Sequence, residues 1–350
     1  VVPGRTPKPI LRCLKISAHK NEVRISATDL EVGIIYLVAG AKVDRDGEVV
    51  IPADRLAAIV RESNDDVIVL DAEDAACNIV GADSHFTIYG QQPDQYPAVP
   101  DFEGEGDLQI SLVNLQAGIA QSLFATAKES TRYALNGVLW EIKGKKLALV
   151  ATDGRRLARA RVNLSKSPDK AAVGASQMIV PSKTMALLDK IGGEQNDNVE
   201  IKLVNNRVLF RCGEAVISSN LVEGNFPKYE DIIPSNYDKK LVIPVDPVLS
   251  AVRRAALLTS EESRGIKLSV GRDSLTFSAR APEAGDAEVK MKIDYSGEPV
   301  EMGFNPQFFI DVLRVIKTDE FELELGQVDR PGLIKSGRDF LYVLMPINLG

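Results

Sequence analysis

The chain has 350 residues, of which 45% are hydrophobic and 26% are charged, and its formal net charge is −7. This is the composition of an ordinary globular protein, and the longest apolar runs fall well short of the roughly 20 residues that a membrane-spanning helix needs. No secretory-signal pattern stands at Val1, so we expect a cytoplasmic protein.

Cysteine and histidine usage argues against several classes of site. Cys13, Cys77 and Cys212 are odd in number, far apart and without CxxC spacing, so we expect buried free thiols and neither a disulfide framework nor a zinc site. His19 and His85 are the only histidines, which weakens the case for catalysis that depends on histidine. A Walker A motif is also missing. We therefore expect no metal, no cofactor and no nucleotide hydrolysis.

The first helix signal follows Pro52, and the same kind of short amphipathic segment returns twice. The second copy begins 129 residues later at Pro181, and the third begins 124 residues after that at Asn305. Other landmarks keep the same order: Ala27-Thr-Asp29 returns as Ala151-Thr-Asp153 with Ser278-Ala-Arg280 in the third place, and Tyr96-Pro97 returns as Phe226-Pro227. Because unrelated spacers separate these landmarks, compositional bias cannot explain them, and the pattern predicts three tandem domains.

Each repeat has the pattern of an α+β domain with antiparallel sheets. In the second, Leu112, Leu115, Ile119 and Leu123 recur at helical spacing, and paired strands are predicted for 133–142 and 146–152. Period-two alternation predicts half-buried strands at 199–204, 289–293 and 321–325. A full repeat thus offers two helices and roughly eight short strands.

Polar, turn-rich stretches near 100–107 and 234–240 mark the joints between domains. The predicted domains are 1–104, 105–234 and 235–350. The helix start at Ser111 precedes Ala151 by 40 residues, whereas Val1 precedes Ala27 by only 26. We therefore expect the first domain to lack its leading helix, because the given sequence starts inside a longer one or at a misassigned start.

The three repeated helices share a cation on the face opposite their apolar stripe. Arg61, Lys190 and Arg314 each stand nine positions after the start of their segment. At 100° per residue they lie about 140° and 200° from the two apolar columns. The columns are Leu56/Met185/Phe309 and Ile59/Leu188/Val312. For one helix such a cation is commonly just part of a solvated face, but three coincidences at one register favour a shared role.

The predicted helices are basic within an acidic protein. Segments 53–62, 111–128, 182–191, 246–258 and 306–317 contain nine Lys or Arg and five Asp or Glu, a net charge of +4. Helices with a basic outward face, carried on sheets with acidic surfaces, suit the lining of an opening around a phosphate backbone. Contacts to phosphates position a duplex without reading its sequence.

Four motifs, taken with the repeat, resemble the bacterial DNA polymerase III beta subunit, the sliding clamp family. They are Arg132–Glu141, Val150–Ala158, Gly224–Pro234 and Tyr342–Gly350, and the likeness covers the whole chain in order. The resemblance implies a DNA-clamp fold and a homodimeric ring of six similar domains, with helices lining the hole and sheets outside. It also implies a protein that performs no catalysis and tethers the polymerase to double-stranded DNA without sequence preference.

The family's partners imply a second site, a groove between the second and third domains. It receives short linear peptides from the polymerase catalytic subunit, the clamp loader and repair proteins. Carried over by position, the groove comprises Leu135, Thr152, Gly154, Arg155, Arg156, Leu157, Pro227, Ile232, Asn305, Phe308, Val343, Met345, Pro346 and Ile347. Apolar and Met side chains make an adaptable trough, and Thr152 with the arginines can meet polar peptide groups. Arg155 and Asn348 depart from the residues common in the family.

The resemblance also extends to DNA and to the joint between subunits. The DNA-facing set comprises Arg5, Arg61, Lys183, Lys190, Arg253, Arg254, Arg314 and Lys317. For the dimer interface, Leu257 and Leu258 are expected to meet the first domain's edge strand around Phe86 and Ile88, because an unpaired edge strand readily pairs with another chain.

Two other functions stay open at this level. Asp29 and Asp153 both follow Ala-Thr and could serve an enzyme as paired carboxylates, although Arg280 takes the third place. The chain could also be a scaffold that binds only proteins, but the cation column would then have no use. Simpler structural roles, such as a strand-end turn at Thr152 and helix-end packing at Leu257, compete with individual site assignments.

Overall fold

A computed structural model describes residues 1–128, 133–167, 177–193, 197–234, 237–259, 265–282 and 284–349. Arg132 and Gly350, which belong to two of the motifs above, lie outside these residues. The chain divides into two compact units, each described below by itself. Unit 1 comprises 1–113, 165–171 and 190–221, and unit 2 comprises 114–164, 172–189 and 222–350.

Among the described helices, none combines the length and the hydropathy that spanning a membrane requires.

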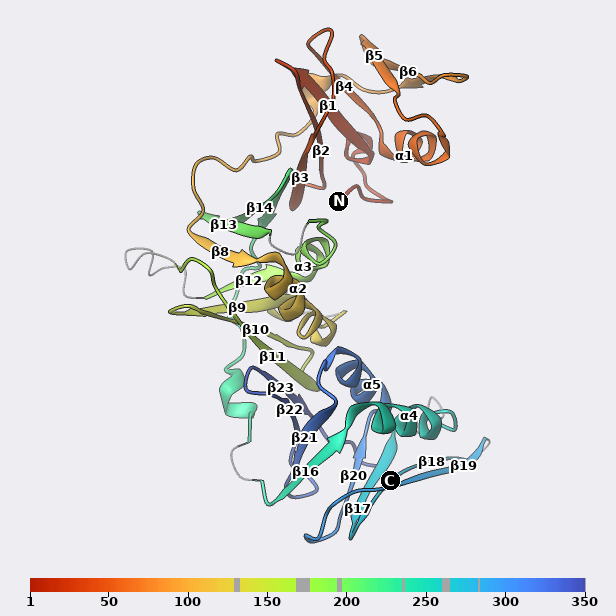
Figure 1. Cartoon of the computed structure of the whole chain (residues 1–350), viewed down its shortest axis with the longest axis vertical. Helices are drawn as coiled ribbons and strands as arrows, with labels where there is room; N and C mark the ends of the chain where they lie inside the picture. The colour runs from red at the N-terminus through yellow and green to blue at the C-terminus, as the bar shows by residue number, and fades with distance from the viewer. Residues whose placement is uncertain are drawn as a thin grey trace. The chain divides into compact units, whose positions relative to one another are not determined.

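Unit 1 is built on one eight-stranded antiparallel sheet in the order β4-β1-β2-β3-β15-β14-β13-β8 (Figure 1). Its strands are β1 (Cys13–His19), β2 (Glu22–Thr28), β3 (Val32–Val38), β4 (Gly47–Pro52), β8 (Leu108–Ser111), β13 (Asn198–Val204), β14 (Arg207–Cys212) and β15 (Ala215–Asn220). Helix α1 (Ala53–Glu62) follows β4, and β5 (Val69–Glu73), β6 (Ala76–Val80) and β7 (His85–Tyr89) form a separate three-stranded sheet. The β3–β15 pairing joins strands of the first and second repeats.

Unit 2 repeats this plan with the order β12-β9-β10-β11-β23-β22-β21-β16. Its strands are β9 (Gly137–Lys143), β10 (Lys146–Thr152), β11 (Arg156–Asn163), β12 (Gln177–Pro181), β16 (Lys239–Pro244), β21 (Glu320–Leu325), β22 (Gly332–Ser336) and β23 (Phe340–Leu344). A four-stranded sheet, β19-β18-β17-β20, is formed by β17 (Ile266–Gly271), β18 (Ser274–Ala281), β19 (Gly285–Lys292) and β20 (Val300–Phe304). The β11–β23 pairing joins the second and third repeats.

The helices of the second and third repeats are α2 (Leu112–Ala120), α3 (Ser182–Leu188), α4 (Val245–Ala256) and α5 (Pro306–Val315). These two repeats each contribute two helices and eight strands among the described residues, as predicted. Helix α5 begins cleanly because Asn305 Oδ1 accepts a hydrogen bond from the Gln307 amide at 2.9 Å and Pro306 occupies the first turn.

The predicted apolar columns face the core. Leu56, Met185 and Phe309 are buried, as are Leu188 and Val312, while Ile59 is half-buried. Phe309 packs edge-on against Phe304 and Phe277, with ring centroids 5.4 and 6.2 Å away. Burying each such side chain stabilises the fold by about 1.5–3 kcal/mol, which fixes these short helices on their sheets.

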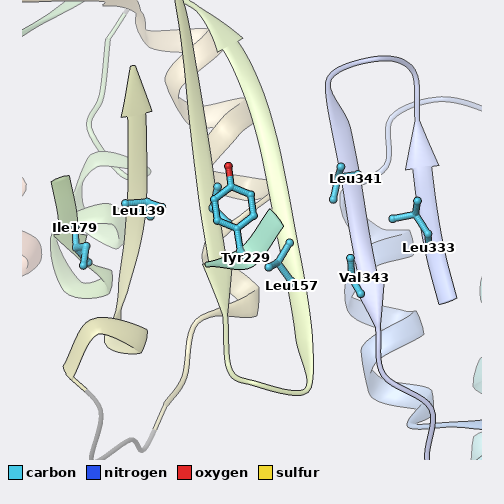
Figure 2. Packing of buried hydrophobic residues seen from close by; sticks show 8 residues of the cluster. Leu139, Leu157, Ile179, Tyr229, Leu333, Leu341 and Val343 are labelled. Carbon is cyan, nitrogen blue, oxygen red and sulfur yellow. The ribbon is translucent and has the colours of Figure 1, made fainter. Parts of the chain in front are cut away.

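The segment between the second and third repeats covers the opposite face of the unit 2 sheet. Figure 2 shows Leu139, Leu157, Leu341 and Val343 on neighbouring strands, with the ring of Tyr229 against them. The Tyr229 hydroxyl donates a hydrogen bond to the buried carboxylate of Glu141. In unit 1 the segment between the first two repeats does the same, because Phe102 packs on Leu209 and Val216.

Several predicted element boundaries are wrong by three residues or more. The helix expected over 182–191 ends at Leu188, so Lys190 lies in the turn after it and not on its face. The helix expected over 111–128 ends at Ala120, and Leu123 lies in a separate 3₁₀ turn. The Ser122 hydroxyl donates to the carbonyl oxygen of Gly118 at 2.8 Å, and this competes with continued helical pairing. The strand expected from Tyr133 begins at Gly137, after a 3₁₀ turn over Tyr133–Asn136. Pairing with β12 reaches only to Gly137, opposite Pro181.

Candidate functional site

A tight turn joins β10 to β11 in unit 2 and is closed by two side chains. The Thr152 hydroxyl donates to the Arg156 carbonyl at 2.7 Å and accepts from the Gly154 amide at 3.1 Å. Asp153 Oδ1 accepts from the amides of Arg155 and Arg156, at 2.9 and 3.1 Å. Gly154 has φ +87°, a conformation that glycine adopts without strain.

The first repeat builds the same turn between β2 and β3. The Thr28 hydroxyl donates to the Val32 carbonyl at 3.0 Å and accepts from the Leu30 amide at 2.9 Å, while Asp29 Oδ1 accepts from Glu31 and Val32. The repeated Ala-Thr-Asp motif is therefore a turn motif. The carboxylates of Asp29 and Asp153 hold backbone amides, so the interpretation of the pair as catalytic acids has no structural support.

Arg156 is the most heavily engaged side chain at the turn in unit 2. It is 8% exposed, and its guanidinium pairs with Asp153 at 2.9 Å and with Asp311 at 2.6 Å. It also donates to the Phe124 carbonyl at 2.7 Å and lies 4.5 Å from the Phe308 ring centroid. Burial alone would lower the pKa of Arg156, but Tyr342 and the two carboxylates raise it above its ordinary value, so the group stays charged.

The last strand and the C-terminal segment complete this region. Strand β11 pairs with β23, placing Leu157 opposite Val343, and the Met345 amide then donates to the Arg155 carbonyl at 3.1 Å. Two residues later the Ile347 amide donates to the Gly303 carbonyl at 2.8 Å, next to Asn305. The chain from Met345 to Ile347 is thus held between the turn and β20.

These contacts bring most of the predicted peptide-site residues together. Leu135, Thr152, Arg156, Leu157 and Val343 are buried, whereas the exposed or half-buried members are Gly154, Arg155, Pro227, Ile232, Asn305, Phe308, Met345, Pro346 and Ile347. Pro227 and Ile232 lie on the covering segment whose Phe226 and Ile233 pack beside Leu157. Leu135 lies in the 3₁₀ turn before β9, and among the described residues it forms no hydrogen bond with the other predicted members.

The polar side chains of this region bond mainly within the protein, whereas Thr152 and Arg156 were expected from the sequence to meet a peptide. The Thr152 hydroxyl donates its one hydrogen bond inside the protein, and each of the three guanidinium nitrogens of Arg156 donates one there too. Arg155 is the exposed cation of the turn. The supporting residues Asp311 and Phe124 were missed, since a lone Asp on a helix and a lone Phe carry no signal of a contact that distant in sequence.

All eight predicted DNA-facing cations are exposed. Within the part of the chain that the structure describes, seven of them form no ion pair: Arg5, Arg61, Lys190, Arg253, Arg254, Arg314 and Lys317. Sheet cations are commonly paired, as in Lys15–Glu48 at 2.8 Å and Lys240–Glu322 at 2.6 Å. In unit 2, α4 and α5 pack side by side (Figure 1), and the last turn of each carries arginine: Arg253 and Arg254 in α4, and Arg314 in α5.

The predicted dimer residues lie at sheet edges. Strand β7 is an outer strand of its three-stranded sheet, where Phe86 is 42% exposed but Ile88 is buried in the core. Strand β19 is an outer strand of the four-stranded sheet in unit 2. Nearby, Leu257 at the end of α4 is 78% exposed, and Leu258 lies beside Gly285, the first residue of β19. Ile88 can therefore contribute only its backbone to an interface.

Three family profiles match the chain in sequence order. They are the N-terminal, central and C-terminal domains of the DNA polymerase III beta subunit, matched by residues 1–100, 109–228 and 230–348. The chain belongs to the beta sliding clamp family. The beta sliding clamp of Vibrio cholerae is 30% identical over 349 residues, covering 99% of this chain and 94% of that protein.

Solved structures of this family have the same fold. The sliding clamp of Pseudomonas aeruginosa bound to griselimycin gives a TM-score of 0.92 at 32% identity, covering 100% of this chain and 94% of that one. The sliding clamp of Bartonella birtlesii bound to griselimycin gives 0.90 at 31% identity, covering 99% and 94%. The clamp is thus three tandem α+β domains, and it acts in DNA replication as a non-catalytic processivity subunit of DNA polymerase III. Its partners include DNA and a DNA polymerase.

Proposed function

We propose that two copies of this chain close into a six-domain ring that encircles duplex DNA. The observation that carries the proposal is an exposed cation at the C-terminal end of the equivalent helix in every repeat. Arg61 and Arg314 lie in the last turns of α1 and α5, and Lys190 lies two residues after the end of α3. Cations without acidic partners can exchange counterions for phosphates, and such contacts are indifferent to base sequence. Enclosure then keeps the ring on DNA, while weak contacts let it slide. The ring would act in the cytoplasm, on the bacterial chromosome.

Ring closure would use the two sheet edges. Strand β7 of one subunit pairs with β19 of the next, and the exposed Leu257 packs against Phe86. A head-to-tail contact of this kind closes when the rotation between subunits is right. Light scattering should give a dimer for the native chain and a monomer at the same concentration for Leu257→Glu. Unchanged dimers in that variant would contradict the assigned joint.

The partner site would be the region around the Thr152 turn. Its accessible apolar members are the exposed Ile232 and Met345 and the half-buried Phe308, Pro346 and Ile347, a set that suits apolar side chains of a short peptide. The polymerase catalytic subunit, the clamp loader and repair proteins would compete for it. Griselimycin, which is bound in two related clamps, should bind here too, and Phe308→Ala should weaken its binding by about tenfold.

The ring is tested by retention on DNA. Clamp loaded onto nicked circular DNA by its loader should stay bound through gel filtration and should leave after the circle is cut. Arg61→Glu, Lys190→Glu and Arg314→Glu together should abolish stable loading. The matched control reverses three exposed strand and hairpin cations, Lys143, Lys145 and Arg161. Equal retention of native clamp on circular and linear DNA would overturn the proposal.

A further inference from the structure

The guanidinium of Arg156 bridges segments from two domains inside unit 2. Its partner Asp153 lies in the turn after β10, Phe124 lies after α2, and Asp311 lies on α5, 155 residues away in sequence. Charged hydrogen bonds of this length are among the stronger ones in proteins, and a fork of donors fixes direction as well as distance. Arg156 therefore ties the turn of the second domain to the first helical turns of α5.

A direct contact of Arg156 with a peptide fits this arrangement poorly. Its Nε donates to Asp153, one terminal nitrogen donates to Asp311, and the other donates to the carbonyl of Phe124. The side chain is 8% exposed. A peptide that displaced one of these bonds would leave a half-buried carboxylate or a carbonyl without its partner, which costs more than the new bond returns. The second hydrogens of the two terminal nitrogens belong to the same buried side chain, so burial limits a peptide's access to them as well.

Arg156 acts on the proposed site through a neighbouring side chain, because its guanidinium packs against the ring of Phe308. The guanidinium carbon lies 4.5 Å from the ring centroid, the range of a cation–π contact. The backbone of Phe308 is held separately, because its carbonyl accepts from the Tyr342 hydroxyl at 3.2 Å. Asp311, which pairs with Arg156, also accepts from Gln307 Nε2 at 2.6 Å. A half-buried aromatic side chain is thus fixed at both its backbone and its ring.

The first repeat supplies an internal comparison. The turn at Thr28 has the same hydrogen bonds, and the Asn220 amide donates to Glu31 at 2.9 Å just as Met345 donates to Arg155. Here Val32 occupies the place of Arg156, and Gly33, in the place of Leu157, is covered by Val99. The turn folds without the arginine, so Arg156 serves something other than turn formation.

We propose that Arg156 is a positioning residue that acts on peptide binding through Phe308. Its charge and its fixed plane hold the Phe308 ring as a wall against which an apolar side chain of the partner packs. The inference rests on the proposed partner site and adds the residue that sets the position of its aromatic wall. Loss of Arg156 frees the ring to adopt other rotamers, and the partner must then reorder it on binding.

The test is a double-mutant cycle measured by titration calorimetry with griselimycin as the probe. Arg156→Met and Phe308→Ala should each weaken binding by about tenfold, and the double variant should bind like Phe308→Ala alone, within about twofold. Arg161→Met, an exposed arginine on the same strand, is the control for lost charge and should bind as the native chain does. Circular dichroism at the titration temperature verifies that each variant is folded.

The outcomes separate this inference from the partner site itself. If Phe308→Ala weakens binding and Arg156→Met keeps its full effect in the Phe308→Ala background, Arg156 contacts the ligand independently and the inference is overturned. If Phe308→Ala leaves binding unchanged, the assigned partner site is wrong and the inference is overturned with it. Should Arg156→Met fail to fold, Asp311→Asn replaces it and should show a smaller loss that also vanishes in the Phe308→Ala background.

Discussion

Gly303 on β20 is the position where one added methyl group should disturb the proposed partner site from outside it. A Cβ there would stand 2.5 Å from the Ile347 carbonyl oxygen and 2.6 Å from Leu349 Cγ, whereas ordinary contacts start near 3.4 Å. The nearest atom belongs to the backbone, so no side-chain rotation relieves the overlap. In Gly303→Ala the segment that carries Met345, Pro346 and Ile347 must move away from β20 by roughly 1 Å.

The size of the effect follows from the overlap in the docked form, which costs about 1–3 kcal/mol. The displaced form lacks the 2.8 Å hydrogen bond between Ile347 and Gly303 in the native chain and in the variant alike, so this bond does not change the difference. Because β20 is folded in both forms, the unfolded-chain entropy of glycine does not change it either. The docked segment is therefore disfavoured by about 2 kcal/mol, which corresponds to about a 30-fold shift between docked and displaced forms.

Titration calorimetry with griselimycin should therefore show affinity reduced by up to about 30-fold in Gly303→Ala. Gly271→Ala is the matched control on the adjacent strand, because its Cβ would meet only the Ser274 hydroxyl oxygen, at 3.3 Å, and that side chain can rotate. We expect the control to bind within about twofold of the native chain. Binding by Gly303→Ala that is equally close to native would refute the argument that the docked segment builds the site.

Three further predictions concern buried polar groups. Burial raises the pKa of Tyr96 to about 12 from 10.0. The stability that the neutral Tyr96 hydroxyl contributes is therefore fully present below pH 10 and is lost as the pH rises through 12. In Tyr96→Phe, alkaline unfolding monitored by fluorescence should show a free energy of unfolding that depends on pH by up to about 3 kcal/mol less than in the native chain. Burial also raises the pKa of the Cys13, Cys77 and Cys212 thiols, so Ellman's reagent at pH 8 should react with them only after denaturation, and prompt labelling of native clamp would contradict their burial. Tyr229→Phe removes the hydroxyl that Glu141 accepts from and should cost about 1.5–3 kcal/mol in urea unfolding, and unchanged stability would show that Glu141 does not depend on it.

Local periodicity explains how much of the fold the sequence predicted. The columns at Leu56, Met185 and Phe309 are buried because helical spacing determines which side chains share a face, whatever the tertiary context. The end of α2 could not be placed in this way. Leu123 continues the apolar spacing, but Ser122 turns its hydroxyl back to Gly118 and closes the helix, and a periodicity argument does not include that competing bond.

Contacts between domains could not be predicted from a single sequence. The β3–β15 and β11–β23 pairings fuse consecutive repeats into continuous sheets, yet nothing in the alternation of those strands indicates their partner. The ion pair of Arg156 could not be predicted for the same reason. The sequence placed Arg156 with Arg155 among the residues expected to meet a peptide, and only the position of Asp311, on a helix of another domain, shows that its side chain is buried and paired.

The two Thr-Asp turns show where the copy with the proposed partner site differs from the copy without it. Both turns keep the same hydrogen bonds, so the motif itself reflects backbone closure. At Thr28 the two positions after the turn are Val32 and Gly33, which lies against Val99, whereas at Thr152 the equivalent positions are Arg156 and Leu157. The proposed function of the second turn therefore depends on residues outside the repeated motif. Replacing Val32 with Arg should leave the first turn folded, but Phe308 and Asp311 belong to the third repeat, so the first turn should gain no affinity for griselimycin.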